Sequence, residues 1–131
     1  MTEDARSMEE LARKVRIGLE TGDLAAYRDL LDPDVHWGPP GVSSPPCQNR
    51  DQVIAWYERA RQAGTRATVS EVEVLGDQIL VGLVVTGNEQ ARDRGGQARW
   101  QLLTVKDARI IDIVGFEQRV EAVDWARRPG E

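Results

Sequence analysis

Residues 31–57 read LDPDVHWGPPGVSSPPCQNRDQVIAWY, and this stretch says more about the fold than any other. It holds the chain's only histidine and only cysteine, and two of its four tryptophans. Its prolines and glycines predict a short strand over residues 35–37, an irregular loop, and then a helix capped by Asp51 that runs to about Gln62. Scarce, reactive side chains in such a connection indicate the wall or mouth of a pocket.

Two further helices are predicted before this stretch. Apolar residues recur at helical spacing over residues 3–20, which indicates one amphipathic helix that ends at Gly22. Asp23 is a favourable N-cap for a second helix over residues 23–31, which we expect Pro33 to stop.

After residue 64 the apolar period changes to two, which predicts four strands joined as a meander. These strands are expected at residues 68–75, 79–86, 97–105 and 109–116. Tight turns at residues 76–77 and 107–108 favour antiparallel pairing. A final helix is predicted over residues 117–128, with Val120 and Val123 on its apolar side.

The predicted strand ILVGLVVT, residues 79–86, is apolar on both faces. One face would meet the helices, so the other needs a cover. A partner subunit is the simplest cover, which predicts a homodimer formed through the outer face of the sheet.

Composition limits the possible functions. The chain has 131 residues, enough for one domain over residues 1–131, and 40% of them are hydrophobic. The net charge of −5, with basic residues scattered apart from Arg92, Arg94 and Arg99, argues against nucleic-acid binding. No apolar run is long enough to span a membrane and no secretory signal begins the chain, so we expect a cytoplasmic protein.

Cofactors are not expected either. Cys47 is a lone cysteine, so it can form neither an intrachain disulfide nor a zinc cluster by itself. The sequence contains no phosphate-binding glycine loop, no serine nucleophile elbow and no zinc-protease motif. Neither a metal nor an organic cofactor is therefore predicted.

The pattern D-P-D-V-x-W-x-P-P-G, followed after a gap by C-x-x-R-D-x-V-x-x-W, resembles the nuclear transport factor two-like superfamily and its SnoaL-like branch. The resemblance covers residues 11–123. It implies an α+β fold in which three to four helices pack on a strongly curved antiparallel sheet. The open end of this cone is commonly a deep pocket, and members are commonly homodimers.

The same resemblance shows what this chain lacks. Ketosteroid isomerase-like members carry a general-base aspartate where this sequence has Gly38, and cyclase-like and epoxide hydrolase-like members carry an acid where it has Gly115. Because glycine cannot accept a proton, the usual acid/base groups of these enzymes are replaced.

His36 is the remaining candidate for acid/base chemistry, since its intrinsic pKa suits proton transfer near neutrality. In a catalytic role it would face the cavity beside Tyr57 or Cys47. In a structural role it would lie exposed on an edge strand, on the face opposite Trp37. The structural role is favoured because no orienting carboxylate is identifiable. Cys47 likewise could be a nucleophile, but a buried apolar role is the more common one.

Aromatic and apolar residues are the candidates for a ligand pocket. They either line a cavity for a flat ligand or form ordinary core. These candidates are Trp37, Cys47, Trp56, Tyr57, Trp100, Tyr27 and Ile113. Glu71 and Glu73 share one side of a strand, as catalytic carboxylates would, but alternating acids usually mark a solvated face.

Three functions remain open at this point. The first is a protein that binds a small hydrophobic molecule without converting it, which the missing acids favour. The second is a cofactor-independent isomerase, cyclase or hydrolase that acts on a hydrophobic ring compound through His36. The third is a protein-interaction module that uses the outer face of the sheet.

Overall fold

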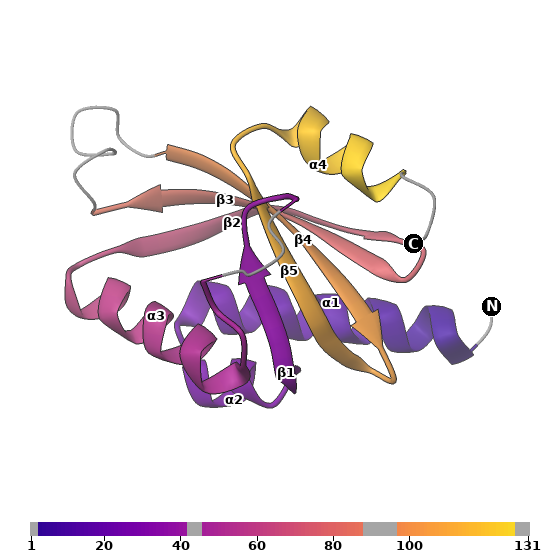
Figure 1. Cartoon of the computed structure of the whole chain (residues 1–131), viewed down its shortest axis with the longest axis horizontal. Helices are drawn as coiled ribbons and strands as arrows, with labels where there is room; N and C mark the ends of the chain where they lie inside the picture. Colours follow the sequence, from indigo (N-terminus) through magenta and orange to yellow (C-terminus); the bar gives the residue numbers. More distant parts are fainter. Residues whose placement is uncertain (1–2, 42–45, 88–96, 128–131) are drawn as a thin grey trace.

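The computed structural model describes residues 3–41, 46–87 and 97–127. In this part of the chain, four helices pack on one five-stranded sheet with the strand order β1-β5-β4-β3-β2 (Figure 1). Along the chain the elements are α1 (Glu3–Thr21), α2 (Leu24–Arg28), β1 (Leu31–Gly38), α3 (Arg50–Gln62), β2 (Arg66–Leu75), β3 (Gln78–Thr86), β4 (Gln97–Lys106), β5 (Arg109–Phe116) and α4 (Arg119–Ala126). The α+β fold expected from the sequence is confirmed.

The four-stranded meander has the predicted antiparallel pairing. β2, β3, β4 and β5 are successive neighbours. The turn between β4 and β5 places both Asp107 and Ala108 at positive φ, as a two-residue type I′ hairpin turn requires. Residues 88–96, which contain Arg92 and Arg94, lie outside the described residues.

β1 departs from the prediction in length and direction. It pairs in parallel with β5, so the sheet is mixed rather than wholly antiparallel. It also begins at Leu31, so Pro33 lies inside the strand and the second helix already ends at Arg28. The sheet tolerates this proline because β1 is an edge strand and its register with β5 is irregular between Leu31 and His36.

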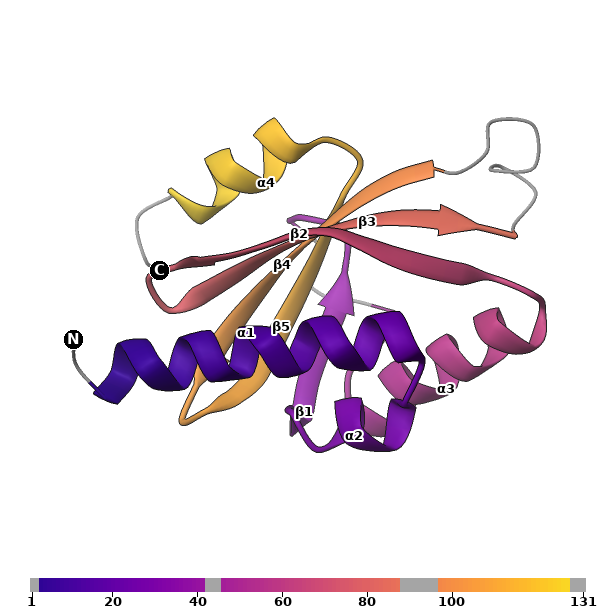
Figure 2. The ribbon, with the colours of Figure 1, turned by 180° about the vertical axis from the view of Figure 1, so that it is seen from behind.

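Three helices cover one face of the sheet, which we call the inner face. α1 packs along β2 and α3 against β1, with α2 between α1 and α3 (Figure 2). Leu11, Val15 and Leu19, spaced one helical turn apart on α1, are buried in this core together with sheet residues such as Val81 and Leu103.

α4 covers the opposite face, which we call the outer face. Leu80 and Leu102 are almost completely buried there, and Ala122 of α4 packs with them. The chain's own C-terminal helix therefore covers the second apolar face of β3, for which a partner subunit was predicted. The apolar side predicted for this helix is wrong in one position, because Val120 is 58% exposed.

The start of α3 also differs from the prediction. Asn49, not Asp51, is the N-cap, and its side-chain oxygen accepts a hydrogen bond from the backbone N–H of Gln52 at 2.9 Å. Asp51 instead lies in the first turn and forms an ion pair with Arg28. Among the described residues, none of the helices has the length and apolar character needed to traverse a bilayer.

Candidate ligand site on the inner face

Aromatic side chains from β1 and α3 meet on the inner face. Trp37 and Tyr57 stack with ring centroids 5.0 Å apart and ring planes 20° apart. Trp56 and Trp37 form an edge-to-face pair with ring centroids 4.7 Å apart, and Tyr27 and Tyr57 form another with ring centroids 5.6 Å apart. Trp37 faces this way because its register partner on β5 is the inner-face residue Ile113. The structure thus brings together four of the residues proposed as pocket lining.

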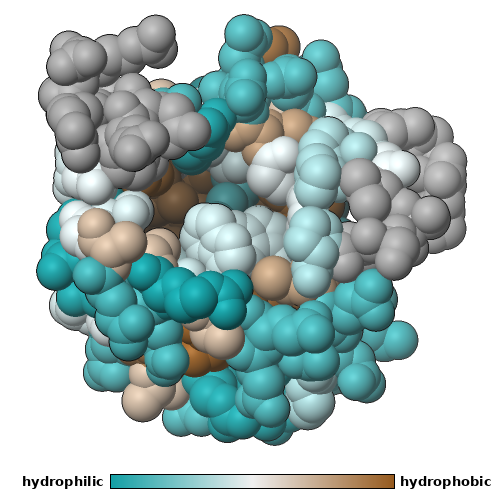
Figure 3. Space-filling model, turned by 60° about the vertical axis from the view of Figure 1, so that its left-hand side comes forward, coloured by the Kyte–Doolittle hydropathy of each residue, from teal (hydrophilic) through white to brown (hydrophobic). Residues whose placement is uncertain are grey.

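Exposure differs along this aromatic cluster. Tyr27 and Ile113 are fully buried, Trp37 and Tyr57 are half-buried, and Trp56 is 46% exposed. The cluster therefore runs from the core to the surface. Figure 3 views the side of the molecule where α3 and the adjoining ends of β2 and β3 lie, and it shows a surface hollow with hydrophobic side chains at its bottom.

Cys47 is held against the same cluster. Its backbone exchanges two hydrogen bonds with Trp37, at 2.9 and 3.2 Å, so the loop end pairs with the free edge of β1. The side chain is buried, and this burial raises the pKa of the thiol, although the positive charge of Arg59 acts in the other direction. Cys47 is therefore a protonated thiol near neutral pH, which is a poor nucleophile.

Gln101 is the functional candidate that the sequence reasoning missed. It is the single polar residue in the buried set of the described residues, at 6% exposed. Its Nε2 donates to the Tyr57 hydroxyl at 3.2 Å, whereas its Oε1 is buried without a hydrogen-bond partner among the described residues. The sequence signal for it was weak, because along β4 Gln101 shares its face with the buried Leu103 but also with the polar Gln97 and Arg99.

The tyrosine hydroxyls beside Gln101 are also buried. Burial raises the pKa of Tyr27 and of Tyr57, and the hydrogen bond from Gln101 partly opposes this in Tyr57. The Tyr27 hydroxyl has no hydrogen-bond partner in the described part of the chain. Both tyrosines therefore keep their protons near neutral pH, and the Tyr57 hydroxyl accepts the hydrogen bond from Gln101.

Gly115 leaves open space in this site. It is the register partner of Gln101 on β5. Among the described residues, a Cβ added to Gly115 would have a single heavy atom within 4 Å, Nε1 of Trp37 at 3.9 Å. Gly115 therefore leaves room for a side-chain atom, and the Trp37 indole N–H borders this space.

His36 lies on the other side of the sheet. It alternates with Trp37 along β1 and is exposed on the outer face, so Tyr57 and Cys47 are not its neighbours as the catalytic hypothesis required. Its register partner is Asp112. Burial raises the pKa of Asp112, and the charge of His36 acts in the opposite direction. The sequence did not reveal this neighbour because the parallel pairing of β1 with β5 was not predicted.

Trp100 also belongs to the outer face and does not join the aromatic cluster. It is in register with Gly82, whose missing side chain makes room for the indole. The guanidinium of Arg119 lies over this indole, 5.9 Å from the ring centroid. Glu71 and Glu73 bind the same arginine, so these paired acids hold α4 to the sheet.

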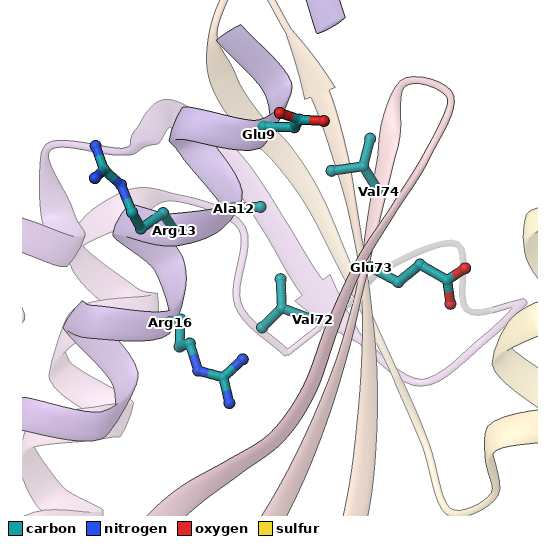
Figure 4. A pocket seen from close by; sticks show the side chains of 7 residues that line it. All are labelled: Glu9, Ala12, Arg13, Arg16, Val72, Glu73 and Val74. Carbon is teal, nitrogen blue, oxygen red and sulfur yellow. The ribbon is translucent and has the colours of Figure 1, made fainter. Parts of the chain in front are cut away.

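An open groove of about 510 Å³ between α1 and β2 is a second hollow. Val72 and Val74 of β2 face α1 across it, whereas Glu73 points to the other side of the strand (Figure 4). Its remaining lining residues come from α1 and are Glu9, Ala12, Arg13 and Arg16. The groove lacks aromatic side chains, so the inner-face cluster is the better ligand site. No group of three potential metal ligands occurs among the described residues.

Comparison with known proteins points to one family. The family model described as a SnoaL-like domain matches residues 12–113. A candidate polyketide cyclase from Sinorhizobium meliloti is similar in structure, with a TM-score of 0.65 and 22% identity over 84% of this chain and 98% of that one. No curated protein matches the chain.

Two further solved structures have a similar fold. A candidate ketosteroid isomerase from Kribbella flavida has a TM-score of 0.70 and 20% identity, over 96% of this chain and 84% of its own. An LEH-like epoxide hydrolase from M. tuberculosis has a TM-score of 0.62 and 12% identity, over 91% of this chain and 88% of its own. At these identities the likeness concerns the fold.

Proposed function

Because the chain belongs to the SnoaL-like domain family, we propose that it is a small-molecule-binding protein that holds a hydrophobic ring compound on the inner face of its sheet. The observation that carries this proposal is the stack of Trp37 on Tyr57 beside the open space at Gly115. Aromatic faces of this kind bind flat apolar rings through dispersion and the removal of apolar surface from water.

The chemistry of the site favours binding over conversion. Proton abstraction needs a base within hydrogen-bond reach of the reacting atom. The described residues that form this site supply aromatic rings, one amide, one protonated thiol and protonated phenols. Of the two positions at which the resemblance would place an acid, Gly115 is a glycine on the inner face and Gly38 is a glycine paired with the outer-face residue Val114, and His36 faces away. A ligand would be held and oriented here without a group to deprotonate it.

Nuclear magnetic resonance can test this proposal with naphthalene as the probe, because the four tryptophan indole N–H groups report on different parts of the molecule. Titration should shift the signals of Trp37 and Trp56 and leave those of Trp100 and Trp125, which lie in or beside the outer-face core, unchanged. Trp37→Ala should weaken naphthalene binding by about tenfold, which corresponds to roughly 1.4 kcal/mol.

The matched control is Trp125→Ala, which removes an indole from the outer face and should leave the affinity for naphthalene unchanged. The proposal is contradicted if none of the four indole signals responds to naphthalene, or if only the signals of Trp100 and Trp125 respond.

A further inference from the structure

We propose that Gln101 determines the specificity of this site by selecting ring compounds that carry an uncharged hydroxyl group at one edge. The inference rests on the proposed binding function and adds the chemical class of the ligand. It follows from an unpaired polar atom, the space next to it, and the absence of ionised partners.

The unpaired atom belongs to a side chain that is almost wholly removed from water. Burying an amide costs free energy unless its polar atoms form hydrogen bonds. One heavy atom of the Gln101 amide is bonded to the Tyr57 hydroxyl, and the other has no partner in the described part of the chain. Turning the amide by 180° only exchanges which atom is unpaired. A ligand hydroxyl, which both donates and accepts, satisfies either orientation.

The space for such a hydroxyl adjoins Gln101 on the neighbouring strand. Gly115 is its register partner, and the missing Cβ leaves this part of the inner face open. Trp37 Nε1 borders the same space and supplies an N–H donor. A ring that packs against the stacked aromatic side chains can therefore direct a hydroxyl toward both the amide and the indole.

The polar atoms that border the space at Gly115 are uncharged, and Arg99, which shares the face of Gln101 on β4, is paired with Glu117 at 3.3 Å. Among the described residues, no ionised side chain forms a hydrogen bond with Gln101, Tyr57 or the Trp37 indole. A ligand carboxylate at this position would lose its hydration, which is costly, and would have to compete with Glu117 for the cation Arg99. A neutral hydroxyl loses less hydration and gains the bonds that Gln101 and Trp37 leave open.

A matched probe series tests the inference: naphthalene, 2-naphthol and 2-naphthoate share one ring system and differ at one position. Isothermal titration calorimetry should give an affinity for 2-naphthol about fivefold higher than for naphthalene, as expected for one net hydrogen bond. The carboxylate should bind more weakly than 2-naphthol. Because naphthalene is the more hydrophobic probe, apolar burial alone predicts the opposite preference.

Gln101→Leu should abolish the preference for 2-naphthol and retain the binding of naphthalene. Gln78→Leu is the control, because Gln78 carries an amide on the outer face, bonded to Thr104, and its loss should leave the preference intact. Should Gln101→Leu not fold, Tyr57→Phe, which removes the hydroxyl that anchors the amide, should reduce the preference.

The outcomes separate the two proposals. Equal affinity of the natural chain for naphthalene and 2-naphthol, or a preference that survives in a folded Gln101→Leu protein, overturns the role of Gln101 and leaves the binding function standing. Binding of neither probe overturns the proposed function itself.

Discussion

At the scale of single residues, two glycines in neighbouring strands have different physical roles. Gly82 of β3 is a packing requirement, because an added Cβ would lie 2.4 Å from an indole carbon of Trp100 and 2.7 Å from the Ser70 hydroxyl. An added Cβ at Gly115 of β5 would meet no such obstacle in the part of the chain that the structure describes. The first glycine maintains the outer-face core, and the second leaves the ligand site open.

We predict that Gly82→Ala destabilises the protein by about 1–3 kcal/mol, the usual cost of overpacking a core. Gly115→Ala should leave the free energy of unfolding unchanged or raise it slightly, since alanine restricts the unfolded chain. Urea denaturation followed by circular dichroism measures both. Equal destabilisation by the two substitutions would show that the space beside Gly115 is not open.

At the scale of elements, α4 is attached to the sheet by packing and by one arginine. Arg119 donates to both carboxylate oxygens of Glu71, at 2.9 and 2.8 Å, and to Glu73 at 3.1 Å. The same guanidinium lies over Trp100. Phe116 at the end of β5 contacts Trp125 of α4 with ring centroids 6.0 Å apart, so both ends of the helix touch the outer face.

This attachment should depend on pH. The hydrogen bonds from Arg119 lower the pKa of Glu71 from its ordinary value of 4.5 in the folded protein. The pair therefore contributes its full stability above the ordinary pKa and loses it as the pH falls through the lowered folded value. Arg119→Met should reduce the midpoint of denaturation modestly at pH 7, because exposed pairs are screened by solvent.

The difference between Arg119→Met and the natural chain should shrink as the solution is acidified below the ordinary glutamate pKa. Arg127→Met, at the C-terminal end of the same helix, is the control for loss of an arginine. Thermal denaturation over a pH series measures both variants. A stability difference that stays constant down to strongly acidic pH would contradict the role of the ion pair.

At the scale of the whole molecule, the outer face no longer needs a partner to cover β3. α4 buries Leu80 and Leu102, so the apolar character of the strand is explained within one chain. A homodimer through this face would have α4 at its interface. Val120, which is 58% exposed on α4, is the apolar side chain available for such a contact.

We predict a homodimer at micromolar concentration in sedimentation velocity, converted to a monomer by Val120→Arg because a charge would be buried at the contact. Ile17→Arg is the matched control, since this exposed apolar residue lies on α1, away from the outer face. A natural chain that sediments as a monomer would contradict the dimer, and a Val120→Arg dimer would exclude this face as the interface.

Much of the fold seen in the described residues could be predicted from the sequence. Helical spacing located α1, period-two alternation located the four meander strands, and β5 coincides with its predicted range. Trp37, Trp56, Tyr57 and Tyr27 of the proposed pocket residues lie together, whereas Trp100, which was expected to converge with Trp37 and Trp56, lies on the outer face. Gln101 was missed because its burial and its hydrogen bond depend on Tyr57 of α3, which meets it only in the folded chain.

The sequence by itself determined the helices, the meander and its turns, because periodicity, capping and turn chemistry act between residues a few positions apart. Only the tertiary structure decided that β1 lies parallel to β5, which places His36 beside Asp112 and turns Trp37 toward Tyr57. It also decided that Trp100 and α4 share the outer face. Register between distant segments depends on packing across the whole chain, and a shift of one residue exchanges the two faces of a strand.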